Sequence, residues 1–137
     1  MSSNTERMRL FVEQVQNNGH LGLIDQLISP DFRNHTPEPG QDNDRESVRA
    51  SMTALRNAFS GFEVEIRHIV GDGDMVATYK VFRGRHTGEW FGIPPSGKPF
   101  ELAVMDHVQY RDGMQIAHWA VADALGFLRQ TGVLERQ

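Results

Sequence analysis

Residues 116–132, IAHWAVADALGFLRQTG, predict a strand that runs directly into a helix, with one carboxylate at the junction. Alternate residues of a strand face opposite sides, so Trp119, Val121 and Asp123 share one face, and that face is apolar until Asp123. Burial beside apolar side chains raises the pKa of a carboxyl group, which makes Asp123 a candidate for proton transfer. Asp is also a preferred N-cap, so the alternative is that Asp123 caps a helix over residues 124–131.

The preceding residues predict the partner strand of this stretch. Residues 99–111 form a long strand, and the Asp-Gly pair at 112–113 is typical of a tight hairpin turn. If the hairpin closes without a bulge, His107 lies opposite His118 on the face away from Asp123. A one-residue bulge at the turn instead puts His107 on the same face as Asp123. The sequence leaves both registers open.

Two histidines have competing interpretations. His107, in a mostly apolar strand, is either a core or interface histidine with one satisfied nitrogen, or a proton donor near the Asp123 carboxylate. His35 stands at the mouth of a proline-rich loop, where it is either solvent-exposed or part of a site. Trp119 is more typical of a core than of a ligand platform.

The rest of the chain predicts helices first and strands afterwards. Apolar residues recur at helical spacing over about 4–18, 21–28 and 44–60, with a short extended piece at 31–35. Strand patterns follow at about 62–70, 75–85, 99–111 and 114–122. This order predicts one α+β domain over residues 1–137, in which consecutive strands pair as an antiparallel sheet. Helices on one face of a curved sheet would leave a hollow between the two layers.

The connection at 87–98 is long and contains several glycines and prolines. Its Trp90, Phe91 and Ile93 are too apolar for a freely solvated loop. We therefore expect this connection to fold over a pocket or over a partner.

Composition excludes several classes of function. The net charge is −4 and the basic residues are dispersed, which gives no footprint for nucleic acid or a membrane surface. The absence of cysteine excludes disulfides, thiolate nucleophiles and thiolate metal sites. No apolar run suggests a membrane span or a signal peptide, so we expect a cytoplasmic protein. The histidines lack metal-binding spacing, and neither a phosphate-binding glycine loop nor a nucleophile elbow is present, so we expect no metal.

Three segments resemble the SnoaL-like polyketide cyclases, which belong to the nuclear transport factor 2-like superfamily. They are SPDFRNH at 29–35, GEWFGIPPSGK at 88–98 and RDGMQIAHWAVADALGFLRQTG at 111–132. The last is the most specific, through HW followed by an Asp and then LGFLRQTG. The likeness runs from about residue 10 to residue 134.

The resemblance implies an α+β cone with a deep, mostly apolar pocket between helices and sheet. Characterised cyclases of this family close the last ring of anthracycline aglycones by intramolecular aldol condensation, without a metal or an organic cofactor. By resemblance, Asp123 is the acid/base and His107 assists it. The substrate-binding residues expected on this basis are His35, Phe91, Met105, Gln109, Trp119 and Val121. Position 121, two residues before Asp123, holds a valine, where a polar residue could have assisted the Asp123 carboxylate.

The expected function is therefore cofactor-independent acid/base chemistry on a polyketide-like or other apolar, aromatic carbonyl compound. One alternative is a hydrolase, hydratase or isomerase on the same scaffold, with a water held by Asp123. Another is a non-catalytic small-molecule binding protein, because a fold does not select a reaction. An open sheet face also predicts a homodimer, through Val104, Val108 and Tyr110 or through their odd-numbered neighbours.

Overall fold

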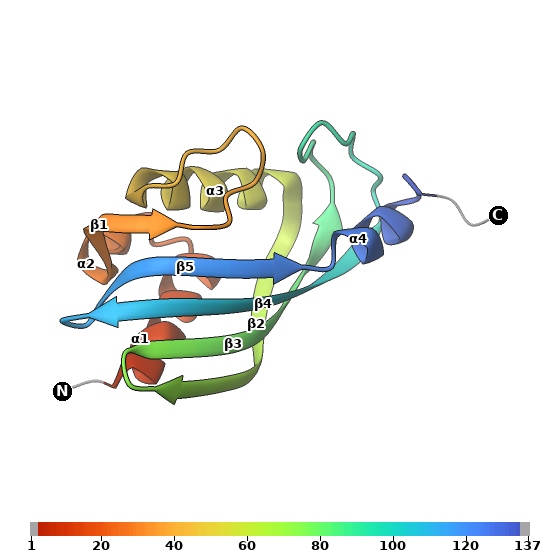
Figure 1. Ribbon diagram of the computed structural model, residues 1–137. Helices are drawn as coiled ribbons and strands as arrows, with labels where there is room; N and C mark the ends of the chain where they lie inside the picture. Colours follow the sequence, from red (N-terminus) through yellow and green to blue (C-terminus); the bar gives the residue numbers. More distant parts are fainter. Residues whose placement is uncertain (1–2, 135–137) are drawn as a thin grey trace.

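A curved sheet of five strands forms one layer of the protein, and helices pack against one of its faces (Figure 1). The computed structural model describes residues 3–134. The strands are β1 (Ile28–Asn34), β2 (Phe59–Asp72), β3 (Met75–His86), β4 (Pro99–Arg111) and β5 (Met114–Ala122). The helices are α1 (Asn4–Leu10), η1 (Phe11–Asn17), η2 (Leu21–Leu23), α2 (Ile24–Leu27), α3 (Arg45–Ala58) and α4 (Ala124–Thr131). The predicted α+β class is confirmed.

The sheet has the order β1-β5-β4-β3-β2. The expected antiparallel pairing of consecutive strands holds from β2 to β5. The sequence prediction of a four-stranded sheet is wrong, because β1 adds a fifth strand in parallel to β5. The second helix, predicted to reach residue 28, ends one residue earlier at Leu27, because Ile28 already has extended backbone angles. Pro30 favours this change, because proline lacks an N–H and cannot continue a helix.

Side-chain caps fix where the first and third helices begin. The Glu6 N–H donates to Ser3 Oγ at 3.2 Å, so Ser3 caps α1, and the Ser3 hydroxyl donates to Glu6 Oε1 at 3.1 Å. The Ser47 N–H donates to Asp44 Oδ1 at 3.0 Å, so Asp44 caps α3 as predicted. No helix within residues 3–134 combines the length and the apolar character needed to cross a membrane.

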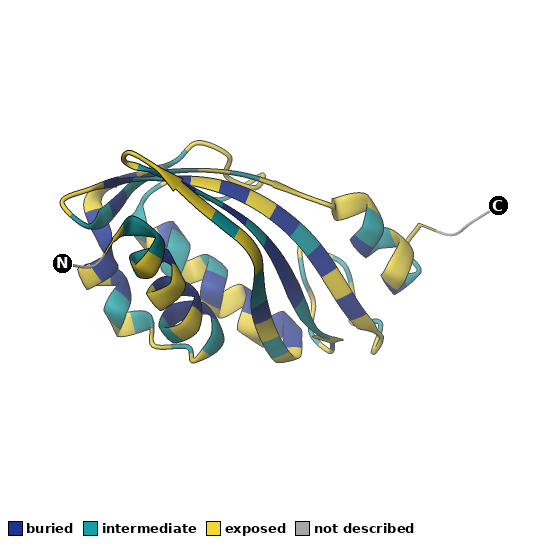
Figure 2. Cartoon of the chain, turned by 90° about the horizontal axis from the view of Figure 1, so that it is seen from below, coloured by how far each residue is buried: buried dark blue, intermediate teal, exposed yellow. Residues whose placement is uncertain are grey.

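The two faces of β4 differ in what covers them (Figure 2). Val104, Val108 and Tyr110 are buried on the face that the helices cover. They are therefore unavailable for a dimer contact, and the open face carries their odd-numbered neighbours. Met105 is 61% exposed there, and Val121 on β5 is 76% exposed.

A bulge decides the register between β4 and β5. The pairing shifts by one residue between Gln109 and Tyr110, which places His107 opposite Trp119 and Val108 opposite His118. The second of the two registers left open by the sequence is therefore the one observed. His118 consequently lies on the face that the helices cover, and His107 on the open face.

Asp123 caps α4, as one interpretation of the sequence predicted. The Gly126 N–H donates to Asp123 Oδ1 at 3.0 Å. A Cβ atom at residue 126 would lie 2.4 Å from Asp123 Oδ2, so the close approach of the carboxylate requires glycine there. At the other end of α4, Gly132 has a φ of 84°, the left-handed conformation typical of a helix C-cap.

Replacing the Asp123 carboxylate should reveal how much this cap stabilises the fold. Asp123→Ala should lower the free energy of unfolding by about 1 kcal/mol, because the Gly126 N–H loses its acceptor. Asp123→Asn should stay close to the parent, since Asn caps helices about as well as Asp. Urea denaturation of the three proteins measures both differences. An equal loss in both variants would show that charge, and not the hydrogen bond, is what stabilises α4.

Candidate active site

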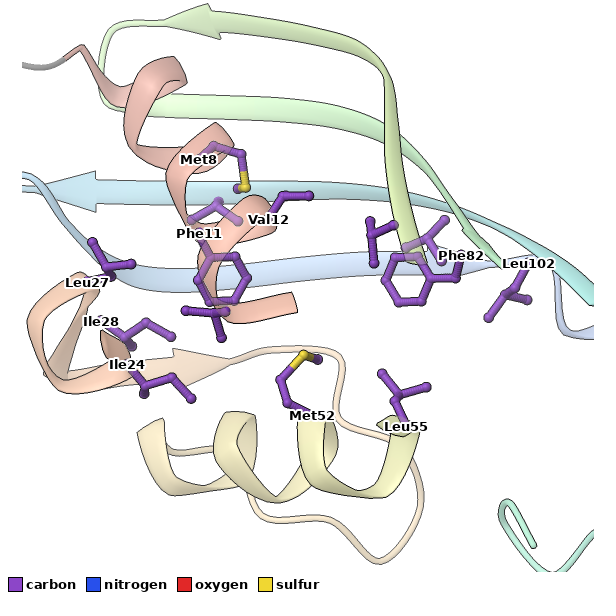
Figure 3. Close-up of a cluster of buried hydrophobic side chains, with 14 of the residues drawn as sticks. Met8, Phe11, Val12, Ile24, Leu27, Ile28, Met52, Leu55, Phe82 and Leu102 are labelled. Carbon is purple, nitrogen blue, oxygen red and sulfur yellow. The ribbon is translucent and has the colours of Figure 1, made fainter. Parts of the chain in front are cut away.

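A pocket of about 210 Å³ lies between the helices and the sheet. Its apolar wall is built from side chains that the helices and the strands present to one another. Figure 3 shows Met52 and Leu55 on α3 on the opposite side of the cluster from Phe82 and Leu102 of the sheet. The apolar lining comprises Met8, Phe11, Phe32, Val48, Met52, Ala54, Leu55, Phe82, Trp90, Phe91, Leu102, Val104, Val108, Ala120 and Ala122. The hollow expected between helices and sheet is present.

The connection at 87–98 reaches the pocket through a two-residue turn. Trp90 and Ile93 exchange backbone hydrogen bonds of 3.1 and 2.9 Å, and Phe91 and Gly92 between them both have positive φ, at 49° and 77°. Positive φ is unfavourable for a bulky residue, so the surrounding contacts must hold Phe91 in place. The Trp90 ring supplies such a contact, with its centroid 5.0 Å from that of Phe91, and it also packs edge-on against Phe127 at 4.9 Å. This placement agrees with the expectation that the connection folds over a pocket.

Polar side chains interrupt the apolar lining on the sheet side. Lys80 on β3 and Asp106 on β4 form an ion pair with 2.9 Å between Nζ and Oδ2. Their side chains are only 3% and 5% exposed. Thr78, directly opposite Asp106 on β3, donates its hydroxyl proton to Asp106 Oδ1. Both carboxylate oxygens of Asp106 therefore have protein partners.

This ion pair brings a cation into an apolar pocket. An ammonium group has three N–H donors, and the contact with Asp106 Oδ2 uses one of them. The Lys80 Nζ also lies 5.9 Å from the centroid of the Phe11 ring, within the range of a cation–π interaction. Because Lys80 lines the pocket, its charge can act on a ligand where little water screens it.

His118 joins the polar group from β5. Its Nδ1 lies 3.0 Å from Asn34 Oδ1, and the Thr36 N–H donates to the same oxygen at 3.0 Å. Because that atom already accepts a proton donor, it is the carbonyl oxygen of the amide, and His118 Nδ1 must carry the hydrogen. His118 Nε2 keeps its lone pair, because the bond from Nδ1 to Asn34 is the one hydrogen bond that the ring makes with residues 3–134.

Burial lowers the pKa of His118 from its ordinary value of 6.5 to about 4. Asp106 acts to raise this pKa and Lys80 acts to lower it, but burial is the largest cause. The imidazole is therefore neutral near pH 7, with a lone pair available in the pocket. That state suits a proton acceptor more than a donor.

The residues predicted from sequence lie mostly elsewhere. Of the eight, Phe91 alone lines the pocket. His107 and Asp123 belong to the open side of the sheet, because the bulge turns His118 inward in their place. The remaining five lie outside the pocket as well: His35, Met105, Gln109, Trp119 and Val121. A catalytic role for them stays a prediction, and the geometric expectation that their face lines the pocket is wrong.

Some of these residues have partners outside the pocket. The rings of His35 and Trp119 stack, with centroids 4.7 Å apart and planes 8° apart. The Gln109 amide donates to Asp74 Oδ2 at 2.8 Å. Within residues 3–134, no three His, Cys, Asp or Glu side chains are placed to hold a metal ion together.

The sequence does contain a signal for the residues that it missed. Asp106 interrupts the apolar run of Leu102, Val104 and Val108, which share its face of β4. Lys80 likewise interrupts the inward face of β3. Charged residues are rarely buried unless paired, so two charges on apolar strand faces indicate a paired, functional arrangement.

Comparison with known proteins identifies the family. The profile of the SnoaL-like polyketide cyclases matches residues 6–131. The chain belongs to the SnoaL-like polyketide cyclase family. It is 30% identical to nogalonic acid methyl ester cyclase of Streptomyces nogalater over 118 residues, which cover 85% of this chain and 88% of the relative. It is 29% identical to aklanonic acid methyl ester cyclase DnrD of Streptomyces peucetius, over 96% of this chain and 92% of the relative.

Solved structures share the fold of this chain. TsrD of Streptomyces laurentii superposes with a TM-score of 0.85 at 29% identity, covering 94% of each chain. IdmH of Streptomyces antibioticus superposes with a TM-score of 0.84 at 32% identity, covering 96% of this chain and 99% of IdmH. The resemblance stated from the sequence is thereby confirmed for both family and fold.

The lowered pKa of His118 predicts how stability depends on pH. In the unfolded chain His118 binds a proton below its ordinary pKa of 6.5, whereas in the folded chain it binds one only below about pH 4. Acid therefore favours the unfolded state. The free energy of unfolding should therefore fall by about 2 kcal/mol from pH 6.5 to about pH 5. Denaturant titrations of the parent and of His118→Gln measure this loss, which should be smaller in the variant. Equal losses in both proteins would contradict a buried, neutral His118.

Proposed function

We propose that this protein closes a ring in a polyketide-type carbonyl compound, with His118 as the proton-transfer group and Lys80 as the stabiliser of negative charge. The observation that carries the proposal is the free lone pair of His118 Nε2 in a pocket that also holds the Lys80 ammonium. A neutral base beside a fixed cation is what the removal of a proton next to a carbonyl group requires.

The proposed reaction is an intramolecular aldol addition. His118 Nε2 takes a proton from a carbon between two carbonyl groups, and Lys80 stabilises the negative charge that develops on the carbonyl oxygen. The enolate carbon then bonds to a second carbonyl carbon of the same molecule, whose oxygen becomes an alkoxide. The protonated His118 returns its proton to that alkoxide, so the product has the composition of the substrate. Because only this proton is exchanged with the protein, the proposed step requires neither a cofactor nor a metal.

The low pKa of His118 restricts the substrate class. A weak base removes a proton efficiently only from an acidic carbon, and a carbon flanked by two carbonyl groups is acidic because its enolate is delocalised. Asp106 and Thr78 hold Lys80 in position and do not need to touch the substrate. The apolar pocket walls suit a flat aromatic polyketide, and they exclude water from the charge that develops.

The relatives suggest substrates for a direct test. Two are methyl ester cyclases for nogalonic acid and aklanonic acid, so the methyl esters of both acids are suitable assays for this chain. The product should have the mass of the substrate and a different retention on chromatography. Binding of either ester without conversion would favour the non-catalytic binding protein.

Two variants distinguish a proton-transfer group in the pocket from one on the open face of the sheet. His118→Gln should lower turnover at least about a hundredfold, because the amide cannot accept the proton. Asp123→Asn should keep the turnover of the parent, since Asp123 caps α4 outside the pocket. Initial rates on whichever ester the parent converts measure both. The reverse pattern, with Asp123→Asn inactive and His118→Gln active, would establish Asp123 as the acid/base.

We propose further that two copies associate through the open face of the sheet. Met105, Trp119 and Val121 on adjacent strands are 61%, 37% and 76% exposed, and they form an apolar patch rimmed by His107. Contiguous exposed apolar side chains on a sheet are typical of an interaction surface. Association of this kind would leave the pocket free for substrate, because Met105, Trp119 and Val121 do not line it.

Light scattering at micromolar concentration should give the mass of a dimer. Val121→Lys should shift the protein to the monomer, because the interface would then bury an unpaired charge. Val70→Lys is the matched control: Val70 is 66% exposed but lies on β2, at the opposite edge of the sheet, so this variant should stay dimeric. A monomer mass for the parent would overturn the proposed association.

A further inference from the structure

Gln16 is a buried amide that lines the pocket without a protein partner for its oxygen. The residue is only 5% exposed, and Oε1 makes no hydrogen bond with any residue that the structure describes. The proposed reaction does not use this side chain. Burying an unpaired amide oxygen is unfavourable, so an unsatisfied one beside a pocket indicates that something else pairs with it.

The main chain around Gln16 is held firmly in place. Arg56 donates from one nitrogen to the carbonyl oxygens of Gln16 and Asn17, at 3.1 and 3.0 Å. The Asn17 side chain donates to the Val64 carbonyl at 3.0 Å and accepts from the Val64 N–H at 2.7 Å. These contacts tie η1 to α3 and β2, so the main chain from which the Gln16 side chain enters the pocket lining is fixed.

The helix around Gln16 is itself unusual. The segment η1 is π-helical, and at its end the Asn18 N–H donates to the Glu13 carbonyl oxygen five residues earlier, at 3.0 Å. The wider turn brings Phe11, Val15 and Gln16 to the buried side together. Such segments are rare and are frequent at functional sites, which is an indication independent of the unpaired oxygen.

We propose that Gln16 binds a hydroxyl group of the substrate and thereby sets its orientation in the pocket. This inference rests on the proposed function, because it concerns a ligand of the same pocket. Oε1 needs a hydrogen-bond donor, which a ketone or an ester lacks and a hydroxyl group supplies. Gln16 lies on the helical wall and Lys80 on the sheet. The ligand is therefore an apolar ring system with a carbonyl group toward the sheet and a hydroxyl group toward η1.

A pair of bicyclic ketones tests this orientation directly. 6-Hydroxy-1-tetralone and 1-tetralone differ by one hydroxyl group, and titration calorimetry measures the dissociation constant of each. The parent should bind the hydroxylated ketone about fivefold more tightly or better. In Gln16→Met, which keeps the length of the side chain and removes the amide, that ratio should fall to about one. The ligand-free melting temperature of Gln16→Met should match or exceed that of the parent, because an unpaired buried amide is gone.

The control and the contrary outcomes separate this inference from the proposed function. Gln14→Met lies in the same helical segment but outside the pocket lining, and it should keep the ratio of the parent. If the parent binds both ketones equally, or if Gln16→Met keeps the preference, the inference is overturned while the apolar carbonyl pocket stands. A lower melting temperature for Gln16→Met with equal loss of both ligands would give Gln16 a structural role only. If the parent binds neither ketone, the proposed function fails and this inference fails with it.

Discussion

The buried ion pair between Lys80 and Asp106 constrains the whole inner surface of the sheet. Two charges that are 3% and 5% exposed can coexist with an apolar core only while they remain in contact. A slip of one residue between β3 and β4 would turn one of the two side chains to the opposite face and leave the other unpaired. Loss of one partner from such a pair costs about 3 to 5 kcal/mol, so the pair fixes the register that also positions Thr78.

The covered face of this sheet is mostly apolar but holds a few buried polar groups, and the open face holds a few exposed apolar ones. The covered face carries a lysine, an aspartate and a histidine, while the open face carries Met105 and Val121. Polar groups are kept inside at a cost in stability, as Gln16 also shows, because a pocket with dry walls strengthens every charge within it. The apolar residues outside form the surface through which we propose that two copies associate.

Periodicity predicted the elements and their order, because helical and strand patterns depend on local burial. It predicted a short extended piece at 31–35 but not its place in the sheet, since this segment pairs in parallel with a strand about 85 residues later and local patterns do not reveal such a contact. Nor did it predict the site. The apolar pattern favours a buried setting for the face of Asp123, whereas the bulge at Gln109 and the position of the helices decide which face is covered. The Asp123 cap could be predicted, since it depends only on residues three positions apart.

The central claim is that the pocket holds a neutral His118 with hydrogen on Nδ1 and a lone pair on Nε2. The hydrogen bond to Asn34 selects this tautomer, and burial keeps it unprotonated. Nitrogen-15 NMR of the His118 ring in the folded, ligand-free protein measures both properties at once. The structure predicts a protonated Nδ1 and an unprotonated Nε2 at neutral pH, with a titration midpoint near 4. Hydrogen on Nε2, or a midpoint near the ordinary value of 6.5, would contradict the account.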